Sequence, residues 1–224
     1  INFDSDFSNC IGFYITLEAN MVLDGSNNTI DYGVNTGLAG IVEMSSNVTS
    51  YAVAPKVQNL TISGGTTADN GGFVVRSGTQ YMTVIDCSST GDITGADSGG
   101  IAGSNIGQGG TVTFTNCHSY GQTIENKGYG IVGGTVYPGN VTASGCTVKQ
   151  GAQIQAVLEN VGVTERWDAA TGSTYFTHVG SNESTSFLDN FSESTVNNIT
   201  TLRLNQNISM SEYTMSKDFY ITLG

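Results

Sequence analysis

The segments VIDC at residues 84–87, FTNC at 114–117 and VTASGC at 141–146 are three versions of one pattern, a short β-type run that ends on a cysteine. A fourth version, VQNLTI at 57–62, has a leucine at the same position. The four marker residues Leu60, Cys87, Cys117 and Cys146 are separated by 27, 30 and 29 residues. A regular period of this length indicates stacked repeats, each burying its apolar side against its neighbours. We therefore predict an all-β solenoid.

Glycines recur at one phase of each repeat: Gly71-Gly72, Gly99-Gly100 and Gly128-Tyr129-Gly130. Such a position suits a corner of the coil where the backbone needs a positive φ or approaches another strand closely. Each coil would contain about three short strands, stacked at roughly 4.8 Å on the coils above and below.

The sequence MVLDGSNNTIDYG at residues 21–33 resembles the opening coils of right-handed parallel β-helices of the pectin-lyase-like class. In that class a short strand, an Asp-Gly or Gly-Asn turn and a Thr-Ile pair recur. The resemblance implies a right-handed parallel β-helix with coils of 27 to 30 residues. The aromatic and β-branched run at 12–17 predicts a strand just before it.

Three regions follow from the pattern. Residues 1–154 are predicted to form the β-helix coils, and residues 155–187, where the pattern stops, an insertion or lateral elaboration. Residues 188–224 return to β-type runs that look like the start of a further repeat unit.

The marker residues are predicted to form an inward ladder, one per coil, in which cysteine acts as a small hydrophobe. The three cysteines could be free buried thiols, form a disulfide between neighbouring coils, or bind a metal ion. Parallel side chains disfavour a disulfide, although its Cα separation could be met. No Cys-x-x-Cys or histidine-rich spacing supports zinc. Cys10 does not fit the spacing of these marker residues.

The sequence Phe-Tyr-Ile-Thr-Leu occurs twice, at residues 13–17 and 219–223, an offset of 206 residues. Chance or simple likeness between coils is one explanation. The other is a unit of about 206 residues followed by the start of the next. Because open ends of a β-helix invite strand pairing, we expect head-to-tail stacking with copies of the same chain. The expected interface residues are Phe13, Tyr14, Ile15, Leu17, Phe219, Tyr220, Ile221 and Leu223.

Composition narrows the classes of partner. Charged residues make up only 12% of the 224 residues, and the net charge is −12. Nucleic acid and anionic membranes would repel such a chain, and no run approaches the roughly 18 apolar residues of a membrane helix. We expect neither nucleic-acid binding nor membrane insertion. The chain starts at Ile1 without a methionine or a visible signal peptide, so we expect a processed product or a piece of a longer protein.

Polysaccharide cleavage is the alternative function. Hydrolysis needs two opposed carboxyl groups, and lyase chemistry needs a basic residue beside acidic calcium ligands. The candidates on adjacent coils are the carboxyl groups of Asp86, Asp92, Asp97 and Glu125 and the bases Arg76 and Lys127. No Asp pair with a Gly-His or Arg-x-Lys signature accompanies them, and His118, next to Cys117, is expected to point outward. We predict no catalytic residue, no metal site and no cofactor.

Asn-x-Ser/Thr sequons mark candidate glycosylation sites at Asn27, Asn47, Asn59, Asn140, Asn182, Asn190, Asn198 and Asn207. Asn and Thr also suit the turns and exposed faces of a β-helix, so the sequons have a purely structural explanation. The segments GGIAG at 99–103 and GIVGG at 130–134 resemble glycine-rich repeats of bacterial surface adhesins and β-helical surface glycoproteins of algal giant viruses. We expect an extracellular, cell-surface or virion-surface structural or adhesive module, with carbohydrate as the alternative partner.

Overall fold

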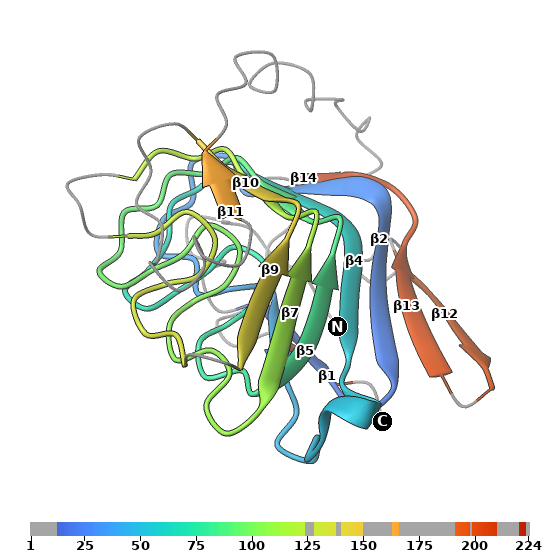
Figure 1. The fold of residues 1–224 in the computed structure, drawn as a ribbon. Helices are drawn as coiled ribbons and strands as arrows, with labels where there is room; N and C mark the ends of the chain where they lie inside the picture. The colour runs from blue at the N-terminus through green and yellow to red at the C-terminus, as the bar shows by residue number, and fades with distance from the viewer. Residues whose placement is uncertain are drawn as a thin grey trace.

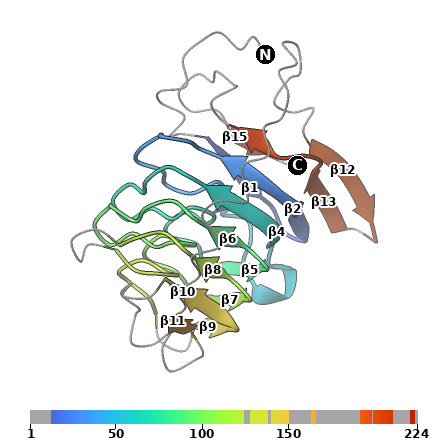
Figure 2. The same cartoon turned by 90° about the horizontal axis from the view of Figure 1, so that it is seen from above.

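The computed structural model describes residues 13–123, 128–137, 140–149, 163–165, 191–197, 199–209 and 220–222. Within these ranges nearly all regular structure is β-strand, and the helical content is one 3₁₀ turn, η2 (Tyr51–Val53). The strands stack coil on coil and pair in parallel with one exception (Figures 1 and 2). The predicted parallel β-helix is confirmed.

Each coil has three sides. The first side is formed by β15 (Tyr220–Thr222), β1 (Tyr14–Leu17) and β3 (Val42–Met44), hydrogen-bonded in that order. Isolated parallel bridges continue this side from Val42 through Val75 and Ala102 to Val132. The strand expected at 12–17 is β1.

The second side is the broadest part of the sheet in Figure 1. Its strands are β2 (Met21–Asp31), β4 (Lys56–Ser63), β5 (Tyr81–Ile85), β7 (Thr111–Thr115) and β9 (Val141–Ser144). The inward residues of this side stack in register: Leu23, Val57, Val84, Phe114 and Ala143. All five are at most 3% exposed, so period-2 alternation sends every second residue into the core.

The third side begins after a corner. It comprises the later halves of β2 and β4, then β6 (Ser88–Ser89), β8 (His118–Ser119), β10 (Cys146–Val148) and β11 (Val163–Glu165). Residues 21–31, where the resemblance implies a short strand, a turn and a Thr-Ile pair, form one bent strand with a register shift between Asp24 and Asn28.

The corner between the second and third sides requires a left-handed backbone in every coil. The residues at this corner are Asn27, Asn59, Asp86, Asn116 and Gly145, with φ values of 62°, 53°, 51°, 51° and 66°. Asn, Asp and Gly are the residues that adopt this conformation most readily. Four of the five come directly before a core residue of the third side, namely Leu60, Cys87, Cys117 or Cys146, and Asn27 comes before the half-buried Asn28.

The glycines that recur at one phase of each repeat are needed for a different reason than the residues of this corner. Gly71, Gly72, Gly99 and Gly100 are not among the residues with positive φ. A Cβ on Gly72 would lie 2.5 Å from the Gly103 backbone nitrogen, and one on Gly99 would collide with the backbone of Ala102 and Gly133. Close approach of the backbone, one of the two expected reasons, explains these glycines.

The C-terminal strands lie at the end of the stack that is formed by the first coil. The strand β13 (Ile199–Leu204) pairs in parallel with the first half of β2, and β14 (Ile208–Ser209) with its last residues. The strand β12 (Phe191–Val196) forms an antiparallel hairpin with β13 at the outer edge (Figure 1). Residues from the predicted third region thus lie before the first coil, beside residues about 180 positions earlier in the chain.

The other end of the stack holds a short continuation. Within residues 155–187, predicted to be an insertion, the described part is β11, and it pairs in parallel with β10. Cys146 lies beside Val163, only 17 residues later. This connection is much shorter than a full coil.

Candidate assembly interface

The two copies of the Phe-Tyr-Ile-Thr-Leu motif lie side by side (Figure 2). The register of β1 and β15 places like residues together: Tyr14 with Tyr220, Ile15 with Ile221 and Thr16 with Thr222. Every described pair in this ladder therefore repeats one residue type on both strands. Phe219 and Leu223 lie outside the described residues.

The first copy of the motif presents an apolar side to the core. Phe13, Ile15 and Leu17 are 3%, 0% and 0% exposed. Tyr14 points to the other side, where the guanidinium carbon of Arg76 lies 4.3 Å from its ring centroid. This cation–π contact, typical of arginine over an aromatic face, gives Arg76 a structural partner on the outer face of β1.

The C-terminal strands extend the core beyond the first coil. Leu202, Leu204 and Ile208 are 5%, 0% and 2% exposed. The register places Leu202 beside Leu23 and Ile208 beside Ile30, so like residues meet here too. Burial of each such side chain stabilises the fold by about 1.5–3 kcal/mol.

Side-chain contacts fix the register of these strands on β2: Arg203 Nη2 to Asp24 Oδ2 at 3.3 Å, Asn28 Nδ2 to the Leu204 carbonyl at 2.8 Å, and the Thr29 N–H to Asn207 Oδ1 at 2.6 Å. A shift of one residue would break all of them and reverse the faces of β13. The pairing of the C-terminal strands with β2 is therefore specific in its polar contacts as well as its apolar ones.

Asp24 is the centre of this polar network. Burial raises its pKa, but hydrogen bonds from the Ser26 N–H, Asn59 and Gln58, together with the charge of Arg203, lower the pKa of this carboxyl below its ordinary value overall. The Asp24 Oδ1 atom accepts hydrogen bonds from the Ser26 N–H at 2.8 Å and from Asn59 Nδ2 at 3.1 Å. Asp24 thus ties the first coil to the second and to Arg203.

The four marker residues lie one above another on the third side. Leu60, Cys87, Cys117 and Cys146 are at most 1% exposed, and the three cysteines are free thiols. Burial raises the pKa of Cys87 to about 12 and the pKa of Cys117 well above its ordinary value. A fully buried thiol with a raised pKa is unreactive. Cys10 lies outside the described residues.

The candidate carboxyl groups occupy different parts of the coil. Asp86 is at the left-handed corner and accepts a hydrogen bond from Asn116 Nδ2 at 3.2 Å. Asp92 lies beyond the third side, where its backbone bridges to Thr66, and its carboxylate accepts the Gln122 N–H. Glu125 and Lys127 lie outside the described residues, as do Asn182, Asn190 and Asn198.

Two further candidates, Asp97 and His118, have local structural contacts. The backbone of Asp97 has a positive φ and accepts the Gly134 N–H. The His118 ring stacks on Tyr120 and its Nδ1 lies 2.7 Å from the Thr147 hydroxyl. Within the described ranges, no three His, Cys, Asp or Glu side chains are close enough together to hold a metal ion.

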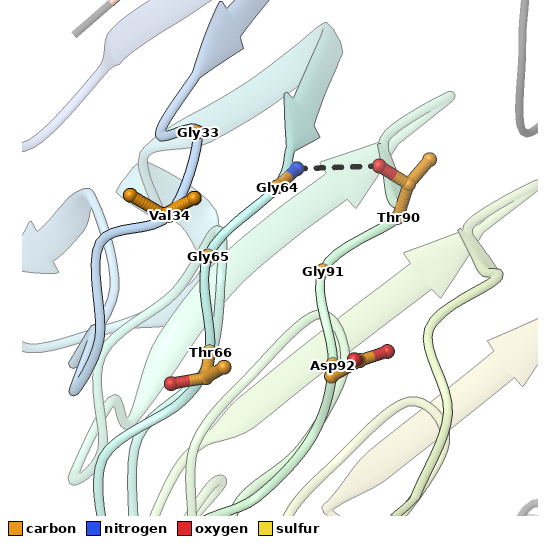
Figure 3. Close-up of a pocket in the computed structure, with 8 residues that line it drawn as sticks. All are labelled: Gly33, Val34, Gly64, Gly65, Thr66, Thr90, Gly91 and Asp92. Carbon is orange, nitrogen blue, oxygen red and sulfur yellow. Dashed lines mark hydrogen bonds between the residues drawn. The ribbon is translucent and has the colours of Figure 1, made fainter. Parts of the chain in front are cut away.

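A shallow depression crosses consecutive coils just after the third side (Figure 3). Its volume is about 280 Å³, and it is lined by Gly33, Val34, Gly64, Gly65, Thr66, Thr90, Gly91 and Asp92. Asp92 is the acidic residue of this lining, so the depression offers one carboxylate. Retaining or inverting hydrolysis needs two.

The described sequon asparagines fall into two groups. Asn27 and Asn47 are exposed. Asn59, Asn140 and Asn207 are half-buried, and their side chains hydrogen-bond to Asp24, Gly107 and Thr29 respectively.

No protein-family model matches the chain, and neither characterised proteins nor solved structures show significant similarity to it. The fold is therefore established by the strand pairing alone. In the described part of the chain, no helix has the length and apolarity needed to cross a membrane.

Sequence reasoning identified the motif and the ladder but missed the polar network around Asp24 and the left-handed corner. The corner has a sequence signal, because Asn, Asp, Asn and Gly come directly before the four marker residues. The contact between Asp24 and Arg203 has none, because 179 residues separate them.

Proposed function

We propose that the chain is a structural module of an extracellular filament, appendage or virion surface, and that it assembles end to end with copies of itself. The observation that supports this proposal is the in-register pairing of β1 with β15, in which Tyr, Ile and Thr each lie beside the same residue. A strand edge that accepts its own sequence in cis has the hydrogen bonding and side-chain spacing to accept it from another copy.

The composition is consistent with a passive structural role. Only 12% of the residues are charged, and the apolar core of the described residues runs continuously through the coils as a stack of short ladders. The exposed sequon asparagines Asn27 and Asn47 would be accessible to glycosylation at a secreted surface.

The test is electron microscopy of the native material combined with its intact mass. Long unbranched filaments support the proposal, and the mass then distinguishes covalently joined units from stacked subunits. Compact particles of 23.4 kDa at every concentration overturn it.

Carbohydrate binding is the second candidate, favoured by the depression in Figure 3, where Thr66, Thr90 and Asp92 present polar groups around glycine backbone. Binding of acidic and neutral oligosaccharides by calorimetry would test it. The variant Asp92→Asn should weaken binding, whereas Asp97→Asn, an exposed carboxyl outside the depression, should not. Equal affinity of both variants and the parent chain removes the depression as the site.

A further inference from the structure

The register of the C-terminal strands agrees with the offset of the repeated motif. Thr200 pairs with Met21, and Ile208 pairs with Ile30. If a second unit starts 206 residues after the first, the equivalents of Met21 and Ile30 follow Thr200 by 27 residues and Ile208 by 28. Elsewhere in the stack, paired residues of neighbouring coils have a similar separation in sequence, such as the 27 residues between Lys56 and Thr83.

This agreement combines two independent observations. The offset of 206 comes from the sequence identity of the motif, and the register comes from strand pairing. Together they place β13 and β14 one regular coil before the β2 strand of a following unit. The segment 199–209 thus has the position of a last coil that the next copy continues.

We propose that residues 199–209 are exchanged between copies, so that β13 and β14 of one chain pair with β2 of the next chain. The partner is a second copy of this chain, and the proposal deepens the assembly role on which it rests. The contacts of the single chain would form unchanged between chains, because the same residues meet.

The open strand edge of the first coil has to be covered by β13 and β14, either from the same chain or from a neighbouring copy. Met21, Leu23 and Ile30 are 5%, 1% and 1% exposed with β13 and β14 in place. Without that cover these side chains would lose part of their burial at an open strand edge. Leu202 and Ile208 from a neighbouring copy would restore it with the same geometry.

The length of the connection between β11 and β12 sets an upper limit on how far the C-terminal strands can reach. Residues 166–190 lie between β11 and β12, and a chain of 25 residues can span at most about 80 Å. Since cis and trans contacts are the same, concentration sets the balance between them. Low concentration favours the closed single chain, and high local concentration favours exchange.

The experiment uses two full-length chains that each carry one reactive thiol. The positions are Val22 and Thr201, which lie side by side in the register and are half-buried. The variants Val22→Cys and Thr201→Cys are made in a Cys10→Ser background, and one of them is labelled with ¹⁵N. The two chains are mixed in denaturant, refolded together at high concentration and treated with a short bis-maleimide.

The matched control pair is Thr115→Cys with Ser144→Cys, because these residues are also neighbours in parallel register but belong to the body of the stack. Exchange predicts that the mixed-isotope dimer linking positions 22 and 201 is at least tenfold more abundant than the mixed dimer of the control pair. Yields equal to the control overturn the proposal, provided that Val22→Cys/Thr201→Cys in one chain cross-links within that chain.

The outcomes separate this inference from the assembly role. Filaments without the mixed dimer mean that copies assemble through another contact, and the exchange proposal fails alone. A mixed dimer that stays a closed pair by light scattering supports exchange and removes the filament. Single chains with neither result remove both.

Discussion

Arg203 Nη2 lies 3.3 Å from Asp24 Oδ2 across 179 residues of sequence, and this contact joins the C-terminal strands to the first coil. The two side chains differ in environment, because that of Asp24 is 8% exposed and that of Arg203 57%. The carboxylate is therefore the energetically important partner. Its hydrogen bonds are sheltered, whereas the guanidinium interaction is screened by solvent.

Replacing Asp24 with asparagine should destabilise the chain by about 1–3 kcal/mol, because an amide N–H₂ would face donors that now meet an acceptor. The folded-state pKa of Asp24 is lowered, so its contribution to stability is present above the ordinary carboxyl pKa and is lost as the pH falls. Urea unfolding between pH 7 and pH 3 should show a loss below about pH 4 that is smaller in Asp24→Asn. Arg203→Gln, the control, should cost about 0.5 kcal/mol. An unchanged acid slope in Asp24→Asn would contradict the network.

The raised pKa of the buried Cys87 thiol predicts that the protein loses stability at alkaline pH. Burial raises its pKa to about 12, from 9.0 for an ordinary thiol. Between these values the unfolded chain loses the proton and the folded chain keeps it, so stability falls as pH rises by up to about 1.4 kcal/mol per pH unit. Cys87→Ala should lack this part of the slope. The measurement is the difference in unfolding free energy between the two proteins at pH 8, 9.5 and 10.5. A difference that does not change with pH would mean that the buried thiol ionises normally.

The coil repeat could be predicted from the sequence because it has a local cause at each position. Stacked coils repeat the same environment, so Leu60, Cys87 and Cys117 occupy equivalent sites and keep a spacing of 27 and 30 residues. The glycine phase is predictable for the same reason, since close approach of backbone or side-chain atoms leaves no room for a Cβ at this phase of each coil. The bent path of β2 was harder to predict, because Ser26 and Asn27 read as a turn and yet remain inside one strand.

The candidate interface depends on contacts between distant parts of the chain, and the sequence pattern carries little information about these. Identity between residues 13–17 and 219–223 indicates a relation, but stacking within one chain and continuation into another give the same identity. Pairing of Tyr14 with Tyr220 becomes visible only with the strand register. The carboxyl groups of Asp86 and Asp92 show the same limit, because proximity in sequence did not predict that the third side of the coil would separate them.

A substitution series at Asp86 distinguishes a structural role from a catalytic one. Asp86 has φ of 51° and accepts a hydrogen bond from Asn116. Asp86→Asn and Asp86→Gly should change the unfolding free energy by less than about 1 kcal/mol, since both residues tolerate this conformation. Asp86→Val should cost about 2 kcal/mol, because a β-branched residue is strained at positive φ. Thermal unfolding measures all three. A large loss in Asp86→Asn with a small one in Asp86→Val would show that the charge of Asp86 matters and its backbone does not.

Gly99 tests whether close packing between coils, and not backbone conformation, explains the repeated glycines. A Cβ at this position would collide with the carbonyl oxygen of Ala102 and approach the Gly133 nitrogen at 2.5 Å, so Gly99→Ala should cost about 2–4 kcal/mol or prevent folding. Gly109→Ala is the matched control, because a Cβ there meets nothing within 4 Å while φ is +72°. Conformational strain alone should then cost about 1–2 kcal/mol. Equilibrium unfolding in urea gives both values, and soluble yield with circular dichroism reports a chain that fails to fold. If Gly109→Ala proved the more damaging change, left-handed backbone conformation would be the main reason for glycine in this fold, and the collision at Gly99 would be relieved by a small shift between coils.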